Sequence, residues 1–235
     1  MIKNQPVPWL RIGAESVAIV GSILLAFAID AWWDTRVERA EEQAHIEALK
    51  DQFERTLVLQ REQIVDLEEA KEATRLLLGI DGAEVQANGW ESVRGLLMQS
   101  TWPGRLNFPS GALEALIAAG ELRVITDREL AARLAAWSSP IAEVYENETF
   151  LLENRDQLLP FLWEHGVTLR QLDARWSDYP PSRLEPSVDT LFADARMEGL
   201  LILRAAHIYN SLNRHGDLAT EATAILALIE RNLSN

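Results

Sequence analysis

The stretch SVAIVGSILLAFAI, Ser16–Ile29, is followed after four residues by a 45-residue run without glycine or proline, 34–78. Fourteen uncharged residues cover roughly 21 Å as a helix, and apolar neighbours on both sides lengthen the run toward the ~30 Å of a bilayer core. Tryptophans near its two ends would lie about 35 Å apart, a separation that suits the two interfaces. The sequence therefore predicts a membrane anchor within residues 1–33, built on one transmembrane helix. The predicted interface anchors are Trp9, Trp32 and Trp33.

Two other interpretations compete with the anchor. A cleaved secretory signal would use Val17–Leu25 as its apolar region and Ala26–Ala28 as its cleavage site. Glu15 directly beside the apolar region and the tryptophan pair directly after the cleavage site both speak against it. A run this short also occurs in helices buried inside a protein core. The transmembrane helix is the interpretation that we carry forward.

Small residues recur every four positions along the predicted span. Small side chains at this spacing let helix backbones approach closely in lipid, where packing drives association in place of the hydrophobic effect. The row predicts helix–helix packing and self-association, as a dimer or a trimer. The row consists of Ala14, Ala18, Ser22 and Ala26, and Asp30 continues it.

The net charge of −14 belongs entirely to the part that follows the anchor, because residues 1–33 hold two basic and two acidic residues. A domain this acidic repels nucleic acid and anionic headgroups, so we expect no nucleic-acid partner. Lys3 and Arg11 before the span nearly balance Arg36 and Arg39 after it. This weak bias predicts a cytoplasmic N-terminus and a large domain outside.

The long run 34–78 predicts one helix that continues directly from the anchor, with a coiled-coil-like apolar seam. The seam contains Ile46, Leu49, Phe53, Leu57, Ile64, Leu67 and Leu78. Polar residues interrupt it at Gln60, Lys71 and Thr74, so the seam alone would make a poor oligomer.

The remaining residues, 79–235, predict an all-α domain that packs back on the long helix, because no run alternates as a strand would. We expect the last helix to lie antiparallel to 34–78, with the shorter helices at the membrane-distal end. A linker at 79–89 and a helix at 90–99 come first, followed by a helix from its cap Ser110 to Ala119 that Gly120 ends. The next two helices run from a Thr126/Glu129 capping box to Trp137 and from Ser139-Pro140 to Leu159, where Pro160 bends or ends the helix and Gly166 closes the segment. A loop at 177–186 leads to a helical region at 187–233, with Gly216 as its candidate interruption.

Several short motifs resemble a bacterial group of uncharacterised, N-terminally membrane-anchored helical proteins, a domain of unknown function. The motifs are Glu15, Ile19-Val20-Gly21, Ile23-Leu24-Leu25-Ala26, Trp32-Trp33, Arg36, Ser110-Gly111-Ala112-Leu113, Gly120-Glu121-Leu122 and Ile125-Thr126-Asp127. The resemblance implies an anchored helical protein of the bacterial inner membrane. It brings no activity and no functional residues.

No reaction motif occurs in the sequence, so we predict no catalytic residue, no cofactor site and no metal site. Glu42-x-x-His45 is half of the pair that a di-iron bundle needs, and no second copy follows. The two late histidines, His207 and His215, are eight residues apart, too far for a zincin pair. There is no cysteine, which excludes thiolate chemistry. The tryptophans at 90, 102, 137, 163 and 176 are expected to be core and loop anchors.

These observations favour a non-enzymatic interaction protein that is held in a lipid bilayer. It would be a self-assembling scaffold or an accessory subunit of an envelope complex, with a copy of itself or another membrane protein as partner. The alternative is a single-span periplasmic sensor or ligand-binding domain. A sensor of the chemoreceptor type needs a second span, and the late apolar runs, Gly199–Leu203 and Ala222–Ile229, are too short for one.

Overall fold

The computed structural model describes residues 9–80, 82–102, 106–173, 175 and 177–234, with side chains throughout except at 9–19 and 82–88. Regular structure in these residues is helical, and no strand occurs among them, which confirms the all-α prediction for this part of the chain. The elements are α1 (Trp9–Gly79), α2 (Gly82–Thr101), α3 (Gly111–Ala118), the 3₁₀ helix η1 (Glu121–Val124), α4 (Arg128–Ala136), α5 (Ser138–Glu164), α6 (Leu169–Leu172), α7 (Val188–Ala193) and α8 (Ala195–Leu233).

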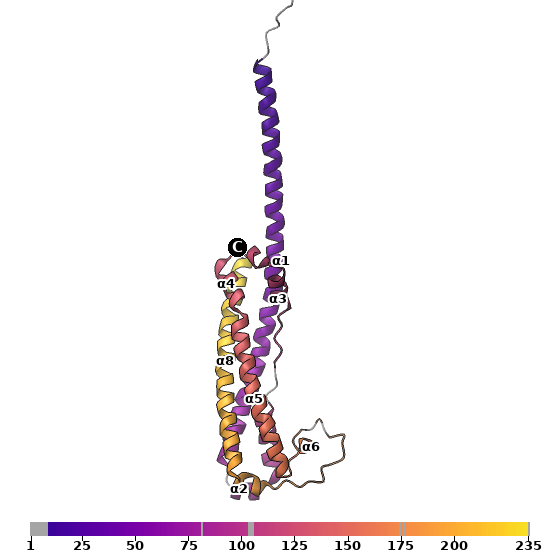
Figure 1. The fold of residues 1–235 in the computed structure, drawn as a ribbon, viewed down its shortest axis with the longest axis vertical. Coiled ribbons are helices and arrows are strands. Elements are labelled where there is room, and N and C mark those ends of the chain that lie inside the picture. The colour runs from indigo at the N-terminus through magenta and orange to yellow at the C-terminus, as the bar shows by residue number, and fades with distance from the viewer. Residues whose placement is uncertain (1–8, 81, 103–105, 174, 176, 235) are drawn as a thin grey trace, which may run out of the picture.

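Helix α1 is a single helix of 71 residues, roughly 105 Å long by its rise. The predicted anchor and the predicted long helix are therefore continuous, as the absence of a breaker between them indicates. Side chains at 20–41 are exposed, and Ile46 is the first buried position among the described side chains of α1. One half of α1 thus projects from the molecule and the other half lies in a helical bundle (Figure 1).

Helix α8 packs along the bundle half of α1 in the opposite direction, and α5 packs against α8. The C-terminal end of α8 lies beside α4, at the level where α1 leaves the bundle (Figure 1). The predicted antiparallel return is confirmed. Two side-chain contacts mark this level: Nε2 of His45 lies 3.3 Å from Oε2 of Glu121, and Arg231 forms an ion pair with Asp127 at 2.7 Å.

The shorter helices divide between the two ends of the bundle. Helices α2, α6 and α7 lie at the end far from the projecting half, whereas α3, η1 and α4 lie near it (Figure 1). The prediction that all of them lie at the far end is wrong for the second group. Thr126 shows the reason, because its backbone N–H and its hydroxyl both donate to Glu42 of α1, at 2.7 and 2.8 Å.

The apolar seam of α1 forms the core of the bundle. Its buried residues are Ile46, Leu49, Phe53, Leu57, Leu67, Ala70, Ala73 and Leu77. Helix α8 presents a matching stripe at three- and four-residue steps, which includes Leu201, Ile208 and Leu218. The seam is therefore covered within the chain. Ile64 is only half-buried and Leu78 is exposed, so these two predicted seam residues lie outside the core.

Three predicted breaks differ from the structure. The linker 79–89 is largely helical: α1 ends at Gly79, α2 already begins at Gly82, and a kink inside α2 falls at Gly89, whose φ of 71° suits a glycine. Pro160 lies inside α5, so it does not end the helix, which continues to Glu164; Gly166 (φ 79°) follows that end. Gly216 does not interrupt α8. The 187–233 region breaks instead at Asp194, whose carboxylate accepts from the backbone N–H of Arg196 at 2.8 Å.

Two predicted helix caps are replaced by other side chains. The cap of α4 is Asp127, which accepts from the backbone N–H groups of Glu129 and Leu130, so the predicted Thr126 box is wrong by one residue. Ser110 precedes α3, yet its side chain makes no capping bond. Gly120 (φ 69°) follows α3 as predicted.

Candidate functional site: the projecting half of α1

The projecting half of α1 carries nine large apolar side chains that no other part of the described chain covers. Their exposed fractions run from 41 to 66 %. They are Val20, Ile23, Leu24, Leu25, Phe27, Ile29, Trp32, Trp33 and Val37. Successive helical residues turn by about 100°, so these side chains surround the helix. A helix that is apolar on every side is one that an apolar environment normally encloses.

None of the described helices combines the length and the apolar character needed to cross a membrane. The apolar run that suggested a span, Ser16–Ile29, starts within residues whose side chains lie outside the described part.

Only two of the four residues in the predicted row of small residues have described side chains. Ser22 and Ala26 lie on α1, one helical turn apart, and both are exposed. Ala14 and Ala18 belong to α1 by their backbone, and their side chains lie outside the described residues. The structure of the single chain therefore places half of the row on a common face.

Trp32 and Trp33 are exposed on neighbouring faces of α1, with ring centroids 6.3 Å apart. The guanidinium carbon of Arg36 lies 5.5 Å from the centroid of the Trp32 ring, within the range of a cation–π contact. Charged residues dominate from Asp34 onward. The tryptophan pair thus lies at the boundary between an apolar and a charged section of one helix. Trp9 is the first residue of α1, and its side chain is outside the described residues.

A buried polar layer crosses the bundle where α1, α5 and α8 meet. Gln60 donates from Nε2 to the carbonyl of His215 at 2.9 Å, and its Oε1 lies 2.9 Å from Nδ1 of the same histidine. Oε1 of Glu148 lies 3.7 Å from Nε2 of His215. Burial lowers the pKa of His215 to about 4, despite that carboxylate, so the imidazole is neutral at pH 7. Gln60, predicted as an interruption of the seam, therefore joins α1 to α8.

A second polar layer is built on Arg204, which is 1 % exposed. Its Nε donates to the carbonyl of Ser100 at 2.8 Å and its Nη1 to the carbonyl of Leu151 at 2.6 Å. Ser100 belongs to the last turn of α2, where the helix dipole favours a cation. Burial, with the nearby Arg155, lowers the pKa of Arg204 to about 10, and the guanidinium stays charged. These contacts hold three helices together.

The described residues contain no group of three or more histidine or carboxylate side chains that could hold a metal ion. The histidines occupy separate surroundings: His45 pairs with Glu121, His165 lies 3.1 Å from the Thr190 hydroxyl, and His207 stacks on Phe150. Among the tryptophans, Trp137 is buried against Phe53, and the guanidinium carbons of Arg155 and Arg175 lie 5.4 and 5.0 Å from the centroid of the Trp102 ring. Trp163 is exposed, and Trp176 lies outside the described residues.

No known protein family, no curated protein and no solved structure matches this chain. The resemblance drawn from short motifs in the sequence stays a prediction.

Proposed function

We propose that this chain is a non-enzymatic interaction protein, anchored in a bilayer by the projecting half of α1. The observation that carries the proposal is the complete ring of exposed apolar side chains between Val20 and Val37. A partner helix would cover one side of such a helix, whereas lipid covers every side. The backbone helix from Trp9 to Trp33 is about 37 Å long, enough for a ~30 Å hydrocarbon core with some tilt.

The residues at the C-terminal end of the ring support the same arrangement. Trp32 and Trp33 would settle at the interface, where amphipathic rings are favoured, and Arg36 would cover Trp32 on the water side. The bundle would then stand beyond the interface on an unbroken helix. In the proposed topology of the bacterial inner membrane, the N-terminus is cytoplasmic and the bundle is periplasmic.

Fractionation of membranes tests the anchor. We expect the full-length chain to remain in the pellet after carbonate and high-salt washes, with its N-terminal residues present by mass spectrometry. Release with a new N-terminus near residue 29 would show a cleaved signal instead. Fusions of alkaline phosphatase and of a fluorescent protein to the C-terminus test the topology, and bright fluorescence without phosphatase activity would reverse it.

The proposed activity of the anchored chain is assembly with itself through the row Ala14, Ala18, Ser22 and Ala26. Since the seam of α1 is covered by α8, the projecting half is the part of α1 left for a partner copy. Ser22→Leu would hold neighbouring backbones apart and should reduce crosslinked dimer or trimer in membranes, whereas Leu24→Ile should not. An unchanged oligomer in Ser22→Leu would point to an accessory subunit that packs against a different protein.

A further inference from the structure

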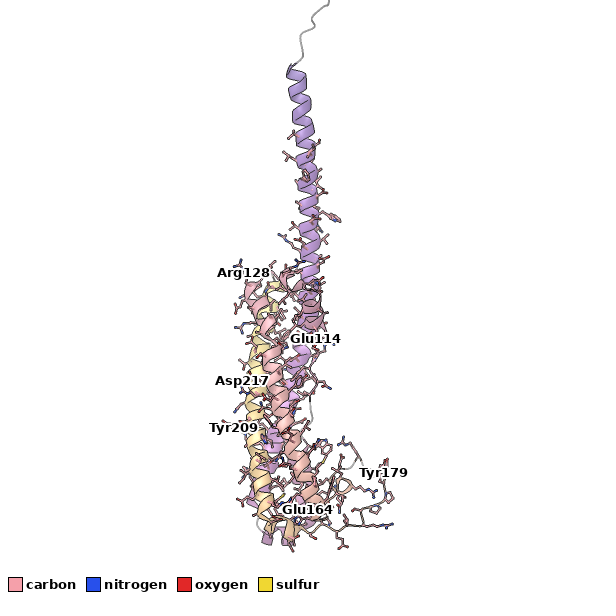
Figure 2. The ribbon with its side chains drawn as sticks, in the orientation of Figure 1. Glu114, Arg128, Glu164, Tyr179, Tyr209 and Asp217 are labelled. Carbon is pink, nitrogen blue, oxygen red and sulfur yellow. The ribbon has the colours of Figure 1, made fainter. Side chains whose placement is uncertain are left out.

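A pocket of about 330 Å³ lies in the half of the bundle near the projecting helix, a size at the lower end for small-molecule sites. Its walls come from α1, α3, α5 and the segment that precedes α3. The lining is mostly apolar and includes Gln52, Ser110, Glu114, Ser138 and Ala142. Figure 2 labels Glu114 on α3, in the upper part of the bundle.

Gln52 is the polar side chain of this pocket that is most deeply buried, at 2 % exposed. Its Oε1 accepts from the backbone N–H groups of Ala112 and Leu113, at 2.9 and 3.0 Å. Two donors fix the amide orientation, because a flipped amide would set N–H against N–H. Nε2 must therefore point elsewhere, and it is buried without a hydrogen-bond partner in the described chain. An unpaired buried donor costs about 1–3 kcal/mol, so an acceptor at this position is favourable.

The charge around the pocket restricts the class of ligand. Glu114 is exposed on α3 and belongs to the pocket lining, and the chain as a whole carries −14. An anionic ligand would meet repulsion at the entrance. Ser110 and Ser138 add neutral hydroxyls among otherwise apolar walls. The lining therefore suits a neutral, mainly apolar molecule.

We propose that this pocket binds a small neutral apolar molecule with one carbonyl oxygen, which accepts a hydrogen bond from Nε2 of Gln52. The bundle then has a ligand-binding role in addition to the membrane-anchored assembly proposed above. The two are independent, because all pocket residues lie in the bundle and none lies in the projecting half of α1.

The absence of cysteine provides a site-specific test in the full-length chain in lipid nanodiscs. Ser138→Cys places a unique thiol in the pocket lining, and Ser139→Cys places one next to it, outside the lining. Benzophenone, a neutral ketone, should slow alkylation of Cys in the first variant at least fivefold and leave the second unchanged. Equal rates with and without benzophenone at its solubility limit, or equal slowing in both variants, would overturn the site.

A hydrocarbon of the same shape tests the carbonyl contact. 1,1-Diphenylethylene replaces the C=O of benzophenone by C=CH₂. In the Ser138→Cys variant with Gln52 unchanged, it should protect the thiol with about fivefold lower affinity than benzophenone, the worth of one neutral hydrogen bond. Gln52→Glu keeps an oxygen for Ala112 and Leu113 and removes the donor, so the ratio of the two affinities should fall to about one. Equal affinities without this change would overturn the Gln52 contact.

A filling variant controls for indirect effects. Ala142→Phe adds a ring to the pocket lining from an exposed position of α5 and should abolish protection of the position 138 thiol. Ala132→Phe adds the same ring at an exposed position of α4 outside the lining and should leave protection intact. Circular dichroism establishes that each variant is folded. Protection that survives in a folded Ala142→Phe protein would place benzophenone somewhere else.

Discussion

The two halves of α1 share one helix and differ in how their apolar side chains are distributed around it. In the bundle half, the apolar residues form a stripe that α8 covers, and the opposite face is largely charged. In the projecting half, large apolar residues surround the helix and remain 41–66 % exposed. The comparison teaches that one backbone helix can be suited to two environments, since the side-chain pattern, and not the backbone, sets what must enclose it.

Arginine substitutions should have the largest effect, and they should affect membrane association only in the projecting half. Leu24→Arg with Leu25→Arg puts two charges in the middle of the apolar section, at about 2.5–3.5 kcal/mol each on the insertion scale. We expect the variant to leave the membrane fraction in a flotation gradient. The matched control is Val58→Arg with Val65→Arg, two exposed positions of the bundle half, which should float like the wild type. Flotation of the Leu24/Leu25 variant would contradict a lipid-enclosed helix.

Phenylalanine truncation compares packing in the two halves. Phe53 is fully buried, with its ring centroid 4.9 Å from that of Trp137, whereas Phe27 is 66 % exposed. Phe53→Ala should lower the free energy of unfolding of the bundle by about 3–5 kcal/mol through lost contacts and a cavity. Phe27→Ala should change it by less than about 0.5 kcal/mol. Denaturant titration followed by circular dichroism measures both, and equal losses would mean that the projecting half packs on the bundle.

The polar layer at His215 makes the bundle half sensitive to acid. Its pKa of about 4 in the folded chain lies below the ~6.5 of an unfolded chain. Between these values the unfolded chain binds a proton that the folded chain does not, so stability falls as the pH falls from about 6.5 to 4. The loss is about 3 kcal/mol at most. Unfolding midpoints measured across this range should flatten in His215→Gln and keep their slope in His45→Gln; an unchanged slope in His215→Gln would assign it to other groups.

Local signals explain how much of this architecture could be predicted. The absence of breakers over 34–78 predicted the long helix, and the helical region at 187–233 was expected to return antiparallel to it. Apolar residues at three- and four-residue steps in that region could have located Arg204 and His215, because both fall on the buried stripe of α8.

Contacts between distant parts of the chain explain the remaining differences. Gln60 and His215 are 155 residues apart, and no local pattern in either segment indicates that they pair. Glu42 binds Thr126 across 84 residues and so leaves the cap of α4 to Asp127. For the candidate site, the sequence supplied the apolar section and the tryptophan pair, and the structure adds that the described side chains of that section are exposed on all sides. Insertion in lipid stays a prediction.

The smallest expected change in stability concerns the N-terminal cap of α3. The test decides whether the cap is the neighbouring Ser110 or a side chain from a distant part of the chain. Ser110 has the residue type and position of a cap, and its side chain makes no capping bond. Gln52 of α1 accepts from the two N–H groups that a cap would satisfy. Gln52→Ala should therefore lower the unfolding free energy by about 1–2 kcal/mol, the usual loss of a cap, whereas Ser110→Ala should change it by less than about 0.5 kcal/mol. Gln52→Glu, which retains an acceptor, should restore most of the loss. A larger loss in Ser110→Ala than in Gln52→Ala would show that Ser110 caps α3. The orientation of the Gln52 amide would then no longer be fixed by the two backbone N–H groups.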